Sequence, residues 1–272
     1  MTFATYAAAQ VLRVVPRVRL SQAVGKLCDA NVPAPLSRLA ASIYCRAYRV
    51  KMEECEANGA YASFDDFFTR RLRDGVRPIA ASGVVSPADG RLEQMGPVRP
   101  NGRIAVKNTE YSVGELIGDD MEAPRYAGGS FCVVYLSPRD YHRVHAPVAG
   151  ELKLVRSLPG DLYPVNSIGE RHVPDLFVRN QRVALVIDTP SMGRVTVVMV
   201  GAIIVGRITV TALGGDDTRP GIYPLKPAVS LQAGDELGVF HLGSTAVLFV
   251  EPGVTLSHDL GSIRYGEALS SR

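Results

Sequence analysis

The feature that most constrains the fold is the texture of the chain after residue 75. Short runs of β-branched and other apolar residues follow one another there, separated by Gly, Pro, Asn and Asp, and no long helical pattern interrupts them. Such runs are typical of strands, and turns at short intervals favour antiparallel pairing. The clearest predicted strands cover residues 131–136, 182–188, 195–200, 203–210 and 246–250. We therefore expect an antiparallel β-rich body over residues 76–272.

The first 75 residues show helical periodicity instead. Leu20, Val24 and Leu27 recur at the spacing of one helix face. Beyond two prolines, the same period continues through Leu36, Leu39, Ala40, Ile43, Ala47 and Val50. The side opposite these residues carries Arg38, Ser42, Arg46 and Arg49. We expect helix to continue to about residue 59 and Ser63 to cap a short helix after it. The predicted fold class is α+β, with a helical region over residues 1–75.

Positive charge is concentrated in the same region. Its first 51 residues contain one acid, Asp29, and eight basic side chains: Arg13, Arg17, Arg19, Lys26, Arg38, Arg46, Arg49 and Lys51. They carry a net charge of +7, whereas the whole chain carries +3. The pattern leaves two readings open: helices that lie in an anionic bilayer interface, or helices that pack on their own domain with a solvated basic face. Nucleic acid is not expected, because no recognised binding motif accompanies the charges.

Composition and cysteine spacing exclude several classes of protein. A chain with 46% hydrophobic and 21% charged residues has the composition of a globular protein. Its apolar stretches are shorter than the ~20 residues of a membrane-spanning helix. No early basic cluster precedes the first apolar run, so a secretory signal is not expected. Cys28, Cys45, Cys55 and Cys132 lack Cys-x-x-Cys spacing. We expect free thiols of a reducing compartment and no zinc site.

Residues 137–147, Ser-Pro-Arg-Asp-Tyr-His-Arg-Val-His-Ala-Pro, form the segment richest in chemistry. They follow an apolar strand and contain five titratable side chains: Arg139, Asp140, His142, Arg143 and His145. A loop of this kind at a strand end is a common place for a site. A solvated loop, a metal pair at His142 and His145, and an acid/base site are the three readings. The acid/base reading is favoured because no third metal ligand is evident nearby.

Two other segments contain residues that could act together with this loop. Asp89 lies in Ser-Pro-Ala-Asp-Gly at residues 86–90, which alone reads as ordinary turn chemistry. Gly243 and Ser244 interrupt a strand-like run near the carboxyl end. They are consistent with a β-bulge, or with a strained peptide bond that the Ser244 hydroxyl can attack. With His145, Asp89 and Ser244 supply the acid, base and nucleophile types of an activated-hydroxyl triad.

Together these segments resemble the signatures of phosphatidylserine decarboxylase proenzymes, most specifically in residues 135–147 and in Leu-Gly-Ser-Thr at residues 242–245. The likeness runs in order from about residue 60 to 250 and is of the bacterial, membrane-associated type. Further matching segments are residues 67–72, 77–78, 162–166, 176–182, 200–206 and 233–238. His241 departs from the pattern, which has Lys or Arg before Leu-Gly-Ser.

The resemblance implies an enzyme that cuts its own chain between Gly243 and Ser244. The products would be a large chain of residues 1–243 and a small chain of residues 244–272. By the same matching, His145 takes the Ser244 hydroxyl proton and Asp89 orients His145. Residue 244 would become a pyruvoyl group, which replaces pyridoxal phosphate and needs no metal. The family converts phosphatidylserine to phosphatidylethanolamine through a Schiff base.

Other roles implied by the resemblance are assigned residue by residue. We expect His142 to act in the acid/base step of decarboxylation, and Arg139 and Arg143 to brace the loop or meet phosphate. The basic helices would dock on anionic membrane, making a peripheral protein on the cytoplasmic face of the cell membrane. Besides this lipid surface and the two chains of one precursor, a homodimer is a further candidate partner.

Two competing functions remain for comparison. A conventional Ser hydrolase would use Asp89, His145 and Ser244 in an intact chain, but the sequence lacks the Gly-x-Ser-x-Gly elbow. A β-rich adaptor on a lipid surface would use the same motifs only to build turns. Two fragments with a blocked small chain distinguish the decarboxylase from both.

Overall fold

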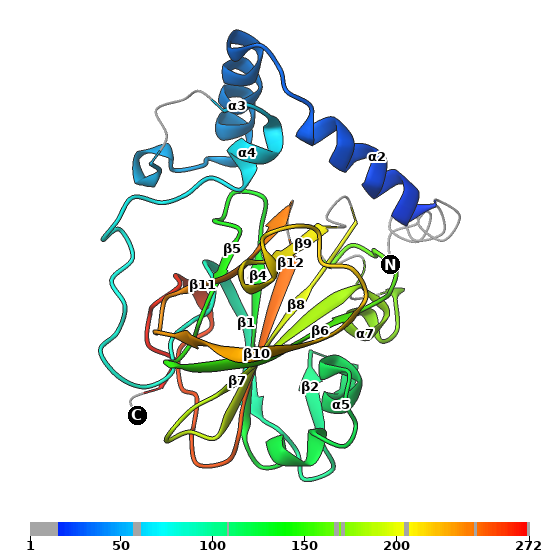
Figure 1. The fold of residues 1–272 in the computed structure, drawn as a ribbon, viewed down its shortest axis with the longest axis vertical. Helices are drawn as coiled ribbons and strands as arrows, with labels where there is room; N and C mark the ends of the chain where they lie inside the picture. The colour runs from blue at the N-terminus through cyan, green and yellow to red at the C-terminus, as the bar shows by residue number, and fades with distance from the viewer. Residues whose placement is uncertain are drawn as a thin grey trace.

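The computed structural model describes residues 16–56, 61–107, 109–165, 169, 172–203, 207–241 and 244–270. Helices come first, and strands dominate the rest of the chain, so the predicted α+β class is confirmed. The helices α2 (Arg17–Asp29), α3 (Ala34–Tyr48) and α4 (Phe64–Phe68), with the short η1 (Met52–Glu54), lie at one end of the β body (Figure 1).

The centre of the molecule is an eight-stranded antiparallel sheet. Its spatial order is β10-β6-β7-β8-β12-β4-β1-β13. In that order the strands span Gly221–Leu231, Gly150–Leu158, Arg182–Asp188, Arg194–Val200, Ser244–Val250, Ser130–Leu136, Gly90–Pro97 and Gly261–Ile263. Strand β12, the last but one along the chain, therefore lies inside the sheet, between β8 and β4.

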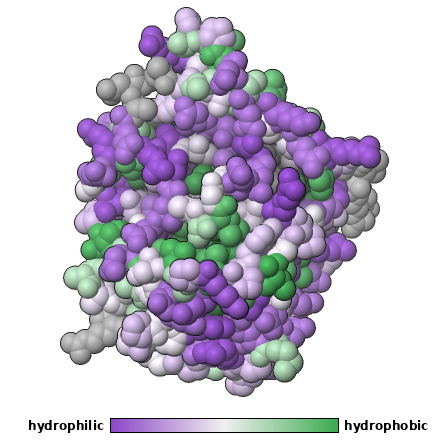
Figure 2. Space-filling model, viewed as in Figure 1, coloured by the Kyte–Doolittle hydropathy of each residue, from purple (hydrophilic) through white to green (hydrophobic). Residues whose placement is uncertain are grey.

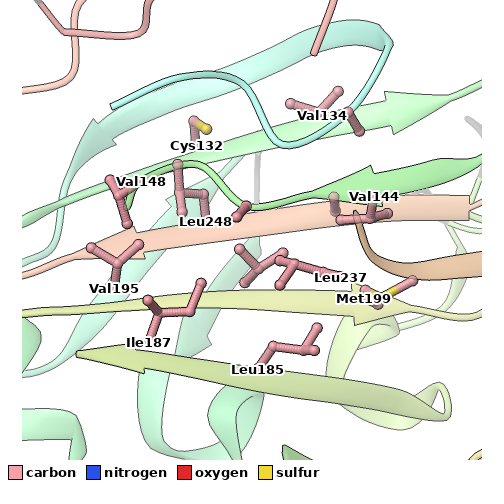
Figure 3. Close-up of a cluster of buried hydrophobic side chains, with 14 of the residues drawn as sticks. Cys132, Val134, Val144, Val148, Leu185, Ile187, Val195, Met199, Leu237 and Leu248 are labelled. Atoms are coloured by element: carbon pink, nitrogen blue, oxygen red, sulfur yellow. The ribbon is translucent and has the colours of Figure 1, made fainter. Parts of the chain in front are cut away.

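Both faces of this sheet are covered. On one face lies a three-stranded sheet of β5 (Arg143–His145), β11 (Glu236–His241) and β9 (Arg207–Val210), followed by η3 (Thr211–Leu213). Figure 3 shows Val144 and Leu237 from this small sheet among side chains of the large one. The elements on the other face are β2 (Arg103–Val106), β3 (Thr109–Ser112), α5 (Val113–Ile117), η2 (Ala123–Tyr126) and α7 (Leu176–Arg179).

Burial on both faces explains why these strands read as continuous apolar runs. In β12, Ala246 and Leu248 belong to one core cluster, whereas Val247 and Phe249 belong to the other. Every residue of β12 is buried. Successive strand side chains point to opposite faces, so a strand with two covered faces needs apolar residues at every position.

Most predicted elements are confirmed, with two differences in extent. Ser63 caps α4, its Oγ accepting a hydrogen bond from the main-chain N–H of Asp66 at 3.1 Å. Of the predicted strand over residues 203–210, β9 covers Arg207–Val210, residue 203 lies in a turn, and residues 204–206 lie outside the described residues. The helix expected to reach residue 59 ends at Tyr48, because Arg49 takes a left-handed conformation and Cys55 then pairs with Leu72 in a β-bridge.

The predicted apolar helix faces exist but do not point into the protein. In α3 the buried residues are Ser37 and Ala41, whereas Leu36, Leu39 and Ile43 are 54–60% exposed. Helix α2 is similar, with Ser21 and Gly25 buried and Leu20 and Leu27 exposed. Of the two readings of these helices, packing of the apolar face on their own domain is therefore wrong for the described residues.

Ion pairs hold α2 against the β body. The buried Arg17 guanidinium donates to both carboxylate oxygens of Asp161 and stacks over the Tyr163 ring at 4.0 Å. At the other end of α2, Asp29 pairs with Arg207 of β9. Arg17 is thus engaged within the protein and is not one of the charges facing outward. None of the described helices is both long and apolar enough to cross a bilayer.

Candidate active site

Ser244 is the first residue of β12 and lies opposite Leu136, the last residue of β4. Its side chain is 1% exposed, and its Oγ has no hydrogen-bond partner among the described residues. Gly243, the other side of the expected cleavage bond, lies outside the residues that the structure describes. The sheet register places Ser244 beside the start of the histidine-containing loop, because residues 137–147 leave the sheet where Ser244 enters it.

The loop is fixed by its own side chains and by the helical region. The Asp140 carboxylate accepts hydrogen bonds from the main-chain N–H of Ser137 at 2.8 Å and from the Ser137 hydroxyl at 2.6 Å. Arg70, which follows α4, donates to the main-chain oxygens of Arg139 and Asp140. These bonds orient the two histidines that follow.

His142 is fully buried, and its ring packs on Phe68 with centroids 4.2 Å apart. Burial, and then the Arg70 charge, lower the pKa of His142 to about 3, so its imidazole is neutral at neutral pH. Nδ1 lies 2.8 Å from the main-chain oxygen of Asp140, an acceptor only, and therefore carries the proton. Nε2 is left with a free lone pair, and it has no partner among the described residues.

His145 has the same arrangement on β5. Burial lowers its pKa, and its Nδ1 donates to the main-chain oxygen of Gly234 at 2.7 Å. Its ring stacks on Tyr265, with centroids 3.8 Å apart and planes 6° apart. Nε2 of His145 is buried and also has no partner within the described chain. Both loop histidines can therefore act as bases through Nε2.

Asp89 is held by partners that the sequence analysis did not identify. Its carboxylate accepts hydrogen bonds from Nε and Nη2 of Arg77, at 2.6–3.2 Å, and from the main-chain N–H of Tyr265 at 2.9 Å. The Arg77 and Asp89 side chains are 5% and 9% exposed. Gly90 fixes the turn, since a Cβ there would lie 2.3 Å from the Tyr135 carbonyl oxygen. Arg77 also bonds Glu54 of η1.

The structure brings Asp89 and His145 together only indirectly. Tyr265 donates its main-chain N–H to Asp89 and stacks its ring on His145. No hydrogen bond between described residues joins Asp89, His145 and Ser244 to one another. Among the loop histidines, His142 lies nearer the end of β11, where the main-chain N–H of Phe240 donates to its carbonyl oxygen. The expectation that Asp89 orients His145 directly thus differs from the bonds found here.

The two loop arginines lie in different surroundings. Arg143 pairs with Glu236 at 2.8 Å and donates to the main-chain oxygen of Thr69, so its guanidinium is engaged in bracing. The Arg139 side chain is 65% exposed and lies 3.8 Å from Asp140. In the described part of the chain, no three His, Cys, Asp or Glu side chains are grouped as metal ligands. All four cysteines are free thiols.

Arg77, Tyr265 and Gly234 contact the predicted site residues, but the sequence alone did not point to these contacts. Arg77 belongs to one of the segments that carried the family resemblance, but nothing marked it as the partner of Asp89. Tyr265 lies in a short tail with no motif, and Gly234 acts through its carbonyl, which every residue has. Only the fold brings these three groups to the site.

Comparison with known proteins agrees with the motifs. The family model described as phosphatidylserine decarboxylase matches residues 64–271. A phosphatidylserine decarboxylase proenzyme of Psychrobacter arcticus is 39% identical over 267 residues, covering 94% of this chain and 95% of the relative. Proenzymes with the same description from Anaeromyxobacter sp. and Bordetella avium are each 38% identical, covering 89% and 94% of this chain and 88% and 92% of the relatives. The chain belongs to the phosphatidylserine decarboxylase proenzyme family, whose members are pyruvoyl-dependent lyases.

Proposed function

We propose that this chain matures by cutting itself between Gly243 and Ser244 and then decarboxylates phosphatidylserine. The observation that carries the proposal is a set of three buried polar atoms without partners in the described chain: Ser244 Oγ, His142 Nε2 and His145 Nε2. Buried polar groups are nearly always hydrogen-bonded, and a catalytic role is one reason for leaving such a group without a partner. A hydroxyl and one neutral imidazole are the groups that self-cleavage requires, and the second imidazole is available for decarboxylation.

The self-cleavage can be written so that every atom is accounted for. His145 accepts the Ser244 hydroxyl proton while Oγ attacks the carbonyl carbon of Gly243. The C–N bond then breaks, the Ser244 nitrogen takes the proton, and an ester replaces the amide. Loss of the Ser244 Cα proton breaks the Cβ–Oγ bond and releases Gly243 as a carboxylate. Water displaces the nitrogen of the resulting dehydroalanine as ammonia, which leaves a pyruvoyl group.

The sheet keeps the two products together after the cut. The small chain would begin with β12, whose seven residues are all buried between β4 and β8, and would end beyond β13 at the sheet edge. Withdrawing a central strand would break two ladders of hydrogen bonds and expose both cores. We therefore expect the large and small chains to remain one particle.

The surroundings of Ser244 fit a pyruvoyl group. Its carbonyl would supply the sink for the electron pair that remains when a substrate amino acid loses CO2. His142, neutral and buried beside Phe68, is our proposed residue for proton transfer at the substrate carbon. Burial on all sides excludes the bulk water that would otherwise compete. Arg139, whose side chain is exposed, is proposed for the phosphate, and Arg143 is proposed to brace the loop through Glu236.

We further propose that α2 and α3 dock the enzyme on anionic membrane. Figure 2 shows hydrophobic surface between hydrophilic atoms at the end of the molecule where these helices lie. The exposed apolar side chains of α2 and α3 include Leu20, Leu27, Leu36, Leu39 and Ile43. Such residues beside Lys and Arg suit a bilayer interface. Free thiols favour the cytoplasmic face as the location. The homodimer has no support in the comparisons, and we do not propose it.

The decisive variant is Ser244→Ala. It removes the attacking oxygen, so we expect a single uncut chain on denaturing electrophoresis and no release of CO2 from phosphatidylserine. The matched control is Ser257→Ala, an exposed serine of the same small chain, which should still cut. Cleavage of the Ser244→Ala protein at the same bond would refute the mechanism. A Ser hydrolase would instead lose activity without any change in chain length.

Variants of the two histidines separate cleavage from decarboxylation. His145→Ala should leave an uncut chain, whereas His142→Ala should still cut but turn over slowly. Loss of a general base typically costs about 10²–10⁴-fold in rate. The opposite pattern, with His142 needed for cleavage and His145 dispensable, would exchange their proposed roles.

Membrane docking is tested by vesicle flotation. The chain with Leu36, Leu39 and Ile43 replaced by Ser should float less with phosphatidylglycerol vesicles than the unchanged chain. Replacement of three exposed polar residues of the body provides the matched control. Equal flotation of all three proteins would remove the docking role of α3.

A further inference from the structure

A cleft with a strong excess of positive charge lies where the helical region meets the β body. Its volume is about 310 Å³. The cationic side chains that line it are Arg49, Lys51, Arg70, Arg77, Arg139 and Arg264. Neither Ser244 nor either loop histidine is among the lining residues. The cleft therefore adjoins the proposed site, with which it shares Asp89, Arg139 and Asp140, and a lipid headgroup bound in it would rest on the proposed function.

The carboxylates of the cleft do not balance these charges. Three acids line it, Glu54, Asp89 and Asp140. Glu54 and Asp89 both pair with Arg77, Glu54 also approaches Arg264 at 3.7 Å, and Asp140 is bonded mainly to the N–H and hydroxyl of Ser137. With every group ionised, the lining keeps three positive charges in excess.

Arg70 provides the second, independent indication of a ligand. It is 5% exposed, yet it forms no ion pair with any described residue. Its Nη atoms donate to main-chain oxygens at 3.2–3.4 Å, which are long for charged hydrogen bonds, and its Nε has no partner in the described chain. A buried charge without a counter-ion is costly, so a protein that keeps one normally pairs it with an anion.

Two further cations are brought to the cleft by the end of α3. Arg49 closes that helix in a left-handed conformation, with a φ of 57°, and Lys51 precedes η1. No described residue forms an ion pair with either side chain. The turn after α3 therefore adds two cations without an ion pair to the lining of the cleft. Arg139 and Arg264 line the same cleft from the body.

We propose that this cleft binds a phosphate group. Guanidinium groups match phosphate oxygens through paired hydrogen bonds, and an excess of three charges suits an anion that carries one or two. The group can belong to a lipid headgroup or to free phosphate, since both present the same oxygens. Binding would also act on the triad acid, because Asp89 lines the cleft and depends on Arg77, which a bound phosphate would share.

The test uses the full chain carrying Ser244→Ala, so that binding is measured on an uncut protein whether or not the proposed chemistry holds. Inorganic phosphate and a short-chain phosphatidylglycerol are titrated separately by calorimetry. Lys51→Gln and Arg264→Gln each remove one exposed cation from the rim. Arg103→Gln is the matched control, because Arg103 is an exposed arginine of β2 outside the cleft.

We expect each rim variant to weaken binding by about tenfold, the effect of one charge-assisted hydrogen bond, and the control to bind as before. Tighter binding of the phospholipid than of inorganic phosphate would assign the cleft to a headgroup, and the reverse order to free phosphate. Absence of binding by both probes, or equal weakening by Arg103→Gln, would overturn the inference. Because self-cleavage is scored separately, a chain that cuts but binds no phosphate refutes only the cleft.

Discussion

The helical region and the β body use hydrophobic residues in opposite ways. All seven residues of β12 are buried, and its side chains fill the cores on both faces of the large sheet. In α3 only Ser37 and Ala41 are buried, whereas Leu36, Leu39 and Ile43 lie on the surface. Strand β12 thus completes its hydrophobic contacts within the chain, whereas these three side chains of α3 stay exposed.

This difference separates two meanings of an amphipathic pattern. Periodicity predicts that an element has an apolar side, but it does not say what covers that side. In the body the cover is another layer of the same chain. The buried residues of α2 and α3 are small or polar, Tyr44 of α3 adds ring contacts with Phe64 and Phe67, and Arg17 anchors α2 through Asp161. The folding energy of the molecule should therefore reside mainly in the body.

The largest expected effect compares one side chain from each region. Phe249→Ala removes a fully buried ring from the core of the sheet and should lower the free energy of unfolding by about 3–5 kcal/mol. Ile43→Ala removes a side chain that is 60% exposed and should change it by less than about 0.5 kcal/mol. Urea unfolding of both variants in a Ser244→Ala background, where every chain is uncut, gives the two values.

Tyrosine fluorescence or circular dichroism can follow this unfolding, since the chain has eleven Tyr and no Trp. Ile43→Ala should instead reduce flotation with anionic vesicles. A loss of 2 kcal/mol or more from Ile43→Ala would contradict the comparison, because α3 would then be packed within the fold.

An effect of intermediate size is expected when the free energy of unfolding is measured at lower pH. The histidines responsible all belong to the body, because no His occurs before residue 142. The pKa of His142 is about 3 in the folded chain and near its ordinary value of 6.5 when unfolded. The stability that depends on neutral His142 is full above pH 6.5 and is lost as the pH falls toward 3, because only the unfolded chain binds the proton in this range. The loss is about 1.4 kcal/mol per pH unit, or roughly 2 kcal/mol by pH 5.

Urea unfolding of the Ser244→Ala chain at pH 7 and pH 5 measures this loss. Adding His142→Asn should make the dependence shallower by about one proton, and the remainder includes His145, whose pKa is also lowered. An unchanged slope after His142→Asn would show that another group is responsible.

The smallest effect is expected at the contact between the two regions. Asp29 of α2 and Arg207 of β9 are 39% and 25% exposed, so solvent screens their ion pair. Asp29→Asn should lower the free energy of unfolding by less than about 1 kcal/mol, and the difference should shrink in high salt. A larger effect, insensitive to salt, would mean that this contact is a structural part of the fold.

The sequence allowed much of the body to be predicted, and the reason is physical. Strands buried on both faces must be apolar throughout, so the strands over residues 131–136 and 182–188 could be predicted from the sequence. The helix cap at Ser63 could also be predicted, because a capping side chain bonds to the main chain only three residues away. The family resemblance is confirmed by the match over residues 64–271.

The bonding of the site could not be predicted in the same way. Asp89 and Arg77 are close in sequence, but Tyr265 comes from the far end of the chain, and Gly234 contributes a carbonyl that carries no sequence signature. The outward direction of the α3 apolar face was also open, since it depends on what the rest of the chain offers as cover. Motifs therefore indicated which residues matter before the fold indicated what they touch.

The proposed function depends most on which group stands at position 244 in the mature enzyme, and intact mass spectrometry of purified, active protein identifies that group directly. We expect two chains, one ending at Gly243 and one beginning at residue 244, the smaller being lighter by one ammonia than a chain that starts with serine. A single full-length chain with undiminished activity, or a small chain that begins with unmodified serine, would contradict the account.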